Sequence, residues 1–298
     1  MSKNKETLAG VKTVCINGSR YQNRYLPRVF TFIEQLKEAD IHVVLRDRFA
    51  DYLRECAGEL PAGTEISSSV PDDAQCAISL GGDGTFIRTA QWIGDREIPI
   101  MGINTGHLGF LSSCSIDETA QFVEELLNGR LCLEARTLLQ LEGDDIPEDF
   151  YPYALNEIAI TKEETSSMIC VGTRVDDVHL ADYLADGLII STPVGSTAYN
   201  LSLGGPILQP SMDCVALTPI APHSLTLRPI VLSGDSVIDC TMESRAEQYR
   251  VSADGRSFVA RRGTHLRIRR APFRVITLRR STDNFAATLQ NKLHWGAR

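Results

Sequence analysis

The segment that most constrains the fold of this chain is a strand-like run that passes directly into a glycine-rich turn. Residues 74–80 are mostly apolar, Gly-Gly-Asp-Gly follows at positions 81–84, and helical spacing then covers Thr85–Ile93. Glycines at three of four positions cost conformational entropy, so a tight turn or a close approach of the backbone must require them. A strand, a tight turn and a helix in this order are typical of a parallel α/β sheet.

The N-terminal part of the chain repeats this alternation of strand and helix. Strand-like runs lie at residues 11–16, 41–45 and 98–103, and helical spacing lies at residues 29–36 and 122–127. Ser115 or Asp117 can cap the last of these helices, Gly129 can end it, and Leu127 is expected to belong to its apolar stripe. We therefore expect residues 1–130 to form an α/β domain with a parallel, Rossmann-like sheet.

From about residue 131, short β-type runs separated by turn residues replace the helices. These runs cover residues 131–141, 153–161, 168–175, 188–192, 236–242, 249–253 and 265–269. They predict a β-sandwich-like C-terminal domain over residues 131–279. The tail at 280–298 looks helical again and is expected to return to the first domain.

The length and the charge of the chain exclude several classes of protein. A chain of 298 residues is long enough for about two domains, and a net charge of −8 argues against coating nucleic acid or an anionic membrane. The eight cysteines stand singly, so neither a zinc site nor a disulfide framework is predicted. The start lacks the apolar segment of a signal peptide, so we expect a cytoplasmic protein.

The turn at 81–84 is chemically suited to phosphate. Its glycines let the backbone come close to a ligand, and the following helix begins with free N–H groups and partial positive charge. Gly81, Gly82, Gly84 and Thr85 are the candidates for presenting these N–H groups. Asp83 would repel phosphate, which makes sense if it accepts a proton from a hydroxyl or helps to hold a divalent ion.

Two plainer interpretations of this segment stay open. The turn can be an ordinary strand-to-helix connection in which Asp83 or Thr85 caps the helix. Arg88, one turn into the helix, can face either phosphate or solvent. Neither the Walker A pattern nor G-x-G-x-x-G is present in the sequence, so no standard nucleotide loop explains the turn.

The second half carries a polar constellation. Asn156-Glu157 stands between two β-type runs and can bind a base edge or a ribose diol, or be an exposed polar pair. Asp186-Gly187 is a common turn dipeptide when taken alone. After it, a strand leads into Pro-Val-Gly and then into hydroxyl and amide side chains, namely Ser196, Thr197, Tyr199, Asn200 and Ser202. Such a cluster offers hydrogen bonds to sugars and amides, and an aromatic face for a base.

Together these motifs resemble the NAD kinase (ATP-NAD kinase) family. The resemblance rests on residues 80–86, 102–110, 155–157 and 186–205, and on an ending that runs from Asn284-Phe285 to Lys292-Leu-His-Trp-Gly296. It spans residues 76–296, and the block at 186–205 is its most specific part. The Gly-Gly-Asp-Gly turn alone is shared with diacylglycerol-type lipid kinases and phosphofructokinases and would not decide between them.

The resemblance implies a reaction and roles for individual residues. The reaction is ATP-dependent phosphorylation of the adenosine ribose 2′-hydroxyl of NAD to give NADP, with Asp83 as general base and Mg²⁺ arriving with ATP. The residues implied to hold the dinucleotide are Asn156, Glu157, Asp186, Thr197, Ala198, Tyr199, Asn200, Ser202 and Asp254. Asp254 also lies in Val-Ser-Ala-Asp-Gly, a typical hairpin turn. The family fold is an α/β domain with a β-sandwich domain, assembled as homodimers or homotetramers.

Two other functions remain open from the sequence. A diacylglycerol-type lipid kinase would share the turn, but the polar residues at 197–202 count against its apolar acceptor. A catalytically silent dinucleotide sensor is opposed only by the presence of Asp83. The arginine-rich stretch at 250–280 can be a patch for phosphates or an acidic neighbour, or simply the solvated face of amphipathic strands.

Overall fold

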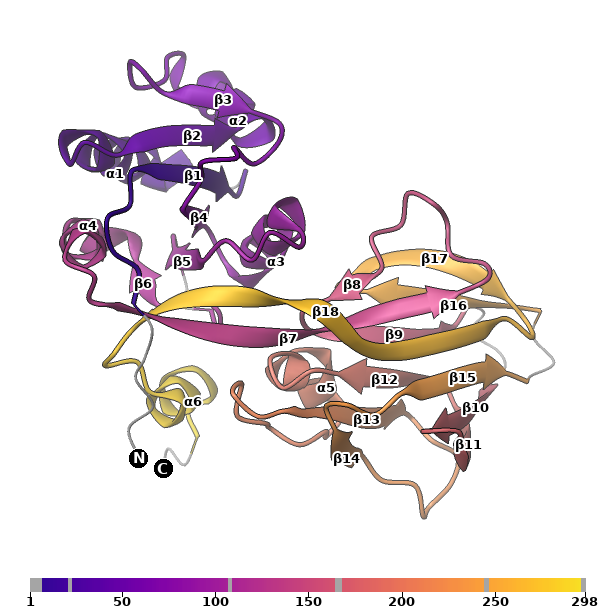
Figure 1. Ribbon diagram of the computed structural model, residues 1–298. Helices are drawn as coiled ribbons and strands as arrows, with labels where there is room; N and C mark the ends of the chain where they lie inside the picture. Colours follow the sequence, from indigo (N-terminus) through magenta and orange to yellow (C-terminus); the bar gives the residue numbers. More distant parts are fainter. Residues whose placement is uncertain (1–6, 21–22, 107–108, 164–167, 244–246, 296–298) are drawn as a thin grey trace. The chain divides into compact units, whose positions relative to one another are not determined.

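The structure, a computed structural model, describes the chain except for residues 1–6, 21–22, 107–108, 164–167, 244–246 and 296–298. The chain divides into two units, which Figure 1 draws in the colours of the sequence. Unit 1 comprises Met1–Ala135 and Val275–Arg298, and unit 2 comprises Arg136–Arg274. The C-terminal segment therefore belongs to the same unit as the N-terminal strands.

Unit 1 is built on a parallel sheet, as the alternating pattern predicts. Its main strands are β1 (Thr13–Gly18), β2 (His42–Arg46), β3 (Glu65–Ser67), β4 (Cys76–Leu80) and β5 (Ile100–Asn104). They lie in the order β3-β2-β1-β4-β5, and each neighbouring pair is parallel. The chain therefore reverses its direction of winding at β1, which creates a switch point between the carboxyl ends of β1 and β4. The predicted α/β class is confirmed.

Five α-helices of unit 1 are described. They are α1 (Leu26–Glu38), α2 (Asp47–Ala57), α3 (Asp83–Ile93), α4 (Thr119–Leu127) and α6 (Phe285–Leu293). The helix α2 and the strand β3 were not predicted. The helix is rich in charged residues, but its buried residues, which include Phe49, Tyr52 and Leu53, follow helical spacing and are a signal that the sequence does contain. Ser115 caps a 3₁₀ turn, η2 (Ile116–Glu118), that leads into α4. The prediction that Leu127 lies in the apolar stripe is wrong, since 46% of it is exposed at the end of α4.

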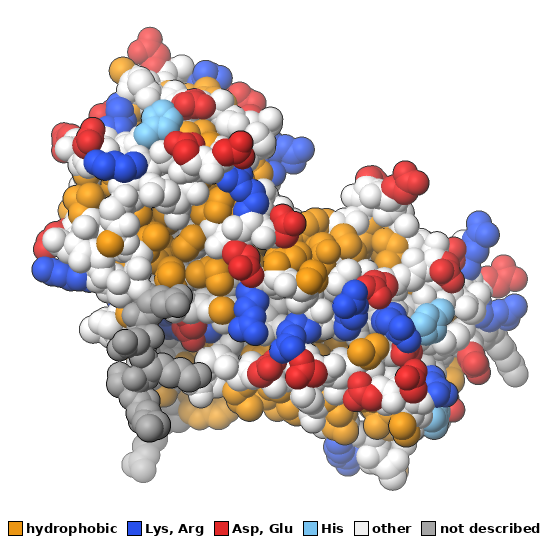
Figure 2. All heavy atoms as spheres, in the orientation of Figure 1, with side chains coloured by type: hydrophobic (Ala, Val, Ile, Leu, Met, Phe, Trp, Pro, Cys, Tyr) orange, Lys and Arg blue, Asp and Glu red, His pale blue; other side chains and the backbone are white. Residues whose placement is uncertain are grey.

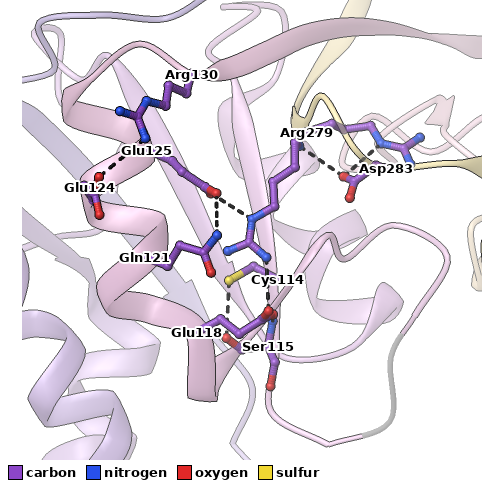
Figure 3. A network of polar contacts seen from close by, with 10 residues as sticks. Cys114, Ser115, Glu118, Gln121, Glu124, Glu125, Arg130, Arg279 and Asp283 are labelled. Carbon is purple, nitrogen blue, oxygen red and sulfur yellow. Dashed lines mark hydrogen bonds and ion pairs between the residues drawn. The ribbon is translucent and has the colours of Figure 1, made fainter.

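An ionic network connects the C-terminal segment to α4 (Figure 3). Arg280 Nε donates to Glu125 Oε2 at 2.7 Å, and Arg280 Nη1 donates to Glu118 Oε1 at 3.2 Å. The side chains of Arg280 and Glu125 are only 12% and 14% exposed. Gln121 donates a further hydrogen bond to Glu125 at 2.9 Å. Burial makes this pair sensitive to the loss of either partner, because the remaining charge would be left uncompensated.

We expect Arg280→Met to destabilise unit 1 by about 2–4 kcal/mol, because the buried charge of Glu125 would lose its cation and keep only the hydrogen bond from Gln121. Urea unfolding followed by circular dichroism measures the change. Arg130→Met is the matched control, because its ion pair with Glu124 is exposed and should contribute less than about 1 kcal/mol. Equal losses of stability in the two variants would contradict the larger contribution expected of the buried Arg280–Glu125 pair.

Unit 2 is a sandwich of two antiparallel sheets. The first joins β7 (Leu131–Gly143), β8 (Tyr153–Ala154), β10 (Ile169–Val175), β11 (Val178–Ala185), β15 (Ile238–Met242) and β18 (His265–Arg280). The second has the order β14 (Ile230–Ser233), β13 (Cys214–Ile220), β12 (Gly187–Ser191), β9 (Glu157–Lys162), β16 (Gln248–Ala253) and β17 (Arg256–Arg261). One core contains Leu139 and Val171 from the first sheet and Ile160 and Leu188 from the second. The predicted β-sandwich is confirmed.

The arginines at 250–280 are mostly paired with acidic side chains. Arg267 donates to Asp239, Arg269 to Glu142, and Arg270 to Asp213 and Asp235. On the face drawn in Figure 2, several basic side chains form a row, and acidic side chains lie beside and below that row. The pairing supports the interpretation as a solvated, charge-balanced strand surface over that of a patch for polyanions.

None of the helices in the described ranges is long and apolar enough to cross a membrane.

Candidate active site

The Gly-Gly-Asp-Gly turn lies where β4 ends and α3 begins, at the switch point of the parallel sheet. Ligands of open α/β sheets bind at this place, outside the carboxyl ends of the strands. Gly81 has a φ of +149°, and a Cβ there would approach Thr85 Oγ1 to 2.6 Å. Both the backbone conformation and the close contact therefore require glycine at position 81.

The turn leaves a small set of backbone N–H groups at the helix start. Thr85 N already donates to Gly82 O at 2.9 Å, and Gly81 N donates to Ile103 O at 2.9 Å. Gly82, Asp83 and Gly84 precede the first residue whose N–H can reach a carbonyl within the helix. Gly82 and Gly84 are exposed. The N–H groups that can meet an anion are thus those of residues 82–84.

Thr85 and Arg88 interact within the first turn of α3. Thr85 is buried, with only 3% of its surface exposed. Arg88 Nη2 donates to Thr85 Oγ1 at 2.9 Å. This bond holds one nitrogen of the guanidinium close to the glycine-rich turn.

Asp83 does not cap its own helix; Gly82 occupies the N-cap position. The Asp83 carboxylate instead accepts hydrogen bonds from Phe110 N at 2.7 Å and from Leu111 N at 3.0 Å. A Cβ on Gly109 would lie 1.8 Å from Asp83 Oδ1, so the backbone reaches the carboxylate only because residue 109 is glycine. These contacts join the motif at 80–86 to the motif at 102–110, of which residues 107–108 lie outside the described ranges.

In unit 2, Asp254 organises the Asn156-Glu157 pair. Asp254 has a φ of +48° in the turn between β16 and β17, which confirms the predicted hairpin. Its carboxylate accepts from Leu155 N at 2.7 Å, Asn156 N at 2.8 Å and Glu157 N at 3.3 Å. These N–H groups leave the strand ladder, and the expected single run at 153–161 divides into β8 and β9. Burial raises the pKa of Asp254, and the three amide hydrogen bonds oppose that shift.

The fold also alters the ionisation of Glu157. Burial raises the pKa of Glu157 to about 7, and the nearby charge of Asp254 adds to the shift. Glu157 Oε2 is buried and has no hydrogen-bond partner among the described residues. A buried acceptor without a partner is costly, and a ligand hydroxyl would satisfy it.

The segment after β12 packs against the same pair. Thr192 N donates to Asn156 O at 2.9 Å, and Thr192 Oγ1 donates to Leu155 O at 2.5 Å. A Cβ on Gly195 would lie 2.1 Å from Asn156 O, so this contact requires glycine. The motifs at 155–157, 192–195 and 254 therefore form one connected site, which sequence spacing alone does not show.

The polar residues at 196–202 divide into buried and accessible members. Ser196 and Asn200 are fully buried. The Asn200 side chain donates to Ser196 O and Pro206 O and accepts from Thr218 Oγ1 at 2.6 Å. Thr197 and Ala198 are half-buried, whereas Tyr199 and Ser202 are exposed. The buried members hold the loop, and the accessible members can meet a ligand.

Asp186 lies apart from this group. It precedes β12, whereas Thr192 follows it, and six residues of extended chain span about 20 Å. Its carboxylate forms an ion pair with Lys162 Nζ at 2.7 Å. The described structure therefore does not bring Asp186 beside Asn156.

Family comparisons match both halves of the chain. Residues 24–131 match the ATP-NAD kinase N-terminal domain, and residues 155–279 match the ATP-NAD kinase C-terminal domain. An NAD kinase of Bacteroides fragilis is 41% identical over 282 residues, which cover 95% of this chain and 97% of that protein. An NAD kinase of Porphyromonas gingivalis is 40% identical over 287 residues, which cover 96% of this chain and 99% of that protein.

Solved structures are similar over nearly the whole chain. A yeast NADH kinase in complex with NADH has a TM-score of 0.87 at 22% identity, covering 100% of this chain and 93% of that one, and supports the fold alone. An NAD kinase from Archaeoglobus fulgidus in complex with ATP has a TM-score of 0.69 at 26% identity. That match covers 91% of this chain and 94% of the other.

Proposed function

This chain belongs to the ATP-NAD kinase family, and on that premise we propose how its own residues phosphorylate NAD. The reaction transfers the terminal phosphoryl group of ATP to the 2′-hydroxyl of the adenosine ribose. The hydroxyl oxygen forms a bond to phosphorus, its proton leaves, and the bond from phosphorus to the departing ADP oxygen breaks. The observation that supports this best is the Gly-Gly-Asp-Gly turn at the switch point of the sheet, where exposed N–H groups stand beside a carboxylate.

In unit 1 the proposed roles are phosphate binding and proton acceptance. The N–H groups of residues 82–84 bind phosphate oxygens at the start of α3, and Arg88 adds positive charge. The N–H groups of Gly81 and Thr85 serve the fold, so those residues act through backbone shape. Asp83 keeps one lone pair on each oxygen beyond its two backbone bonds, and one of these accepts the proton of the 2′-hydroxyl.

In unit 2 the proposed role is to hold the dinucleotide. Glu157 Oε2 accepts from a ribose hydroxyl, because it is a buried acceptor without a partner in the protein. The Asn156 amide side chain and the accessible Thr197, Tyr199 and Ser202 provide further hydrogen bonds and a ring face. Ala198, Asn200 and Asp254 act by shaping the backbone around them, and Asp186 stays a weaker proposal because it lies apart.

We treat Mg²⁺ as part of the Mg–ATP substrate. The described residues contain no group of three His, Cys, Asp or Glu side chains that could hold a metal ion. The turn offers a single carboxylate, which is already bonded to two N–H groups, and this is too few oxygen ligands for a protein-built metal site. Bound to ATP, the ion would offset charge on the phosphate oxygens. A homodimer or homotetramer is proposed from the family resemblance alone, and a cytoplasmic location stays a proposal as well.

One assay tests the proposed function. Purified protein is incubated with ATP, Mg²⁺ and either NAD or diacylglycerol, and NADP and phosphatidate are measured. NADP formation is the expected result. Tight binding of NAD without any NADP would favour the dinucleotide sensor, and phosphatidate would favour the lipid kinase.

Binding of NAD should depend on the ionisation of Glu157. With a pKa of about 7, the carboxylate is mostly protonated at pH 6 and mostly ionised at pH 8. Because the ionised form is the better acceptor from a ribose diol, we expect the Kd for NAD to fall by up to about tenfold between these pH values. Calorimetry measures the Kd. Glu157→Gln should remove the pH dependence, and Glu247→Gln, an exposed control, should retain it.

The stability of unit 2 should show the opposite trend. The folded pKa of Glu157 lies above its ordinary value of 4.5, so folding favours the protonated form. The protonated Glu157 carboxyl contributes fully to the free energy of unfolding below about pH 4.5, and this contribution is lost as the pH rises through about 7. Glu157→Gln should therefore gain stability relative to the natural chain between pH 5 and pH 8, by at most about 3 kcal/mol. A difference in Tm between Glu157→Gln and the natural chain that did not change with pH would contradict a raised pKa of Glu157.

A further inference from the structure

Lys292 is a half-buried lysine that the family resemblance names only as part of the C-terminal signature. It lies near the end of α6, and its Nζ is 4.5 Å from the centroid of the Phe110 ring. Nζ is buried, and no hydrogen-bond acceptor for it exists among the residues that the structure describes. Gly296, at the end of the same signature, lies outside the described residues.

Phe110 connects this lysine to Asp83. The backbone N–H of Phe110 donates to Asp83 Oδ2 at 2.7 Å, while the Phe110 ring lies beside the Lys292 ammonium. The charged group that acts on Lys292 is the same Asp83 carboxylate, from α3. The helix α6 itself contains no other titratable side chain. A single residue, Phe110, therefore contacts both the Lys292 ammonium and the carboxylate of the proposed base, Asp83.

The surroundings of the ammonium are incomplete without a ligand. An ammonium carries three N–H donors, and burying them without acceptors is unfavourable. Burial lowers the pKa of Lys292 to about 8, and the charge of Asp83 opposes that shift. The Phe110 ring attracts the cation but accepts no conventional hydrogen bond. What is missing is an oxygen-rich anion close to Asp83.

We propose that Lys292 binds the phosphoryl group transferred at the Gly-Gly-Asp-Gly turn, with its ammonium donating to the phosphate oxygens. The inference rests on the proposed NAD kinase reaction and adds a second cation to the one that Arg88 provides beside the turn. N–H groups of residues 82–84 carry only partial charge, whereas the transferred group carries full negative charge on its oxygens. A lysine ammonium provides the compensating point charge that phosphoryl transfer requires.

A purely structural role predicts different behaviour. If Lys292 only attached α6 to the loop through the Phe110 ring, its loss would lower Tm and leave kcat nearly unchanged. A phosphate-binding role predicts a loss of kcat/KM for ATP, with the affinity for NAD preserved. The two roles are separable because NAD binding and thermal stability are measured without phosphoryl transfer.

The experiment compares Lys292→Met, Lys292→Arg and the exposed control Gln290→Met on the same helix. In Lys292→Met we expect kcat/KM for ATP to fall by about 10²-fold or more, with the Kd for NAD within about twofold. Lys292→Arg should retain at least about a tenth of the activity, because it keeps the charge. Gln290→Met should match the natural chain in activity and Tm.

The pH profile at saturating NAD gives a second readout that a structural role would not change. In the natural chain kcat/KM for ATP should decline above about pH 8, because the Lys292 ammonium deprotonates there. In Lys292→Arg the decline should disappear, since a guanidinium stays charged. An unchanged kcat/KM for ATP in Lys292→Met would overturn the inference. It would also be overturned if Lys292→Met and Lys292→Arg lost kcat/KM equally and both had a lowered Tm.

A binding measurement separates this inference from the proposed function. If the natural chain forms no NADP, the kinase assignment fails, and calorimetry with inorganic tripolyphosphate then tests the lysine. Weaker tripolyphosphate binding by Lys292→Met than by Gln290→Met would support an anion site at Lys292. Equal binding by the two variants would reject it.

Discussion

Replacing Asp83 by asparagine should remove most of the turnover and leave NAD bound. An amide cannot accept the proton of the 2′-hydroxyl, so we expect kcat to fall by about 10²–10⁴-fold. The Kd for NAD should stay within about threefold, because the proposed dinucleotide residues lie in unit 2. Steady-state NADP formation gives kcat, and calorimetry gives the Kd.

The structure adds a second consequence for this variant. Asp83 accepts from the N–H groups of Phe110 and Leu111, and asparagine offers only one acceptor oxygen to them. One of these N–H groups would face an amide donor, so a loss of about 1–3 kcal/mol in stability should accompany the loss of rate. Asp95→Asn, exposed just after α3, is the matched control. Near-normal turnover in Asp83→Asn would end the assignment of Asp83 as general base.

Replacing Asp254 by alanine should give the largest loss of stability. Its carboxylate is the acceptor for the N–H groups of Leu155, Asn156 and Glu157, and no side-chain acceptor would remain. Each unsatisfied buried donor costs about 1–3 kcal/mol, so we expect unit 2 to lose about 3–5 kcal/mol. Urea unfolding measures the loss. NAD binding should weaken as well, because the Asn156-Glu157 backbone would no longer be held.

Two comparisons make this result specific to the carboxylate. Asp254→Asn tolerates the left-handed backbone at φ +48° and keeps one acceptor, so its loss should be smaller than that of alanine. Asp182→Ala, at a side chain that is 63% exposed, should change stability by less than about 0.5 kcal/mol. An Asp254→Ala chain as stable as Asp182→Ala would show that water replaces the carboxylate without cost.

Local patterns predicted the elements whose apolar period is strong. The buried runs before the glycine-rich turn and around β5 were predicted as strands, and α3 follows the turn as expected. The helix α2 and the strands β11, β13, β14 and β17 were not predicted. The helix α2 and the strands β11 and β17 carry charged residues among the apolar ones, whereas β13 and β14 contain none. The burial of these strands depends on the strands that pair with them, so tertiary packing decided their extent.

The candidate site divides in the same way. Motif chemistry predicted Asp83 beside phosphate-binding glycines and predicted a polar pair at 156–157, because these depend on local backbone and residue type. It did not predict that Asp83 holds the loop at 109–111, or that Asp254 holds Leu155, Asn156 and Glu157 from 97 to 99 positions away. Partners so distant in sequence leave no spacing signal.

The sequence by itself determined the strand–turn–helix at 74–93, the change from alternating strands and helices to strands alone near residue 131, and the family. Only the tertiary structure decided which N–H groups of the turn stay free, which polar residues at 196–202 are buried, and that Lys292 stands beside Phe110. The physical reason is that residue type sets what a group can donate, accept or bury. Whether a partner reaches it depends on chain segments that meet only when the protein folds.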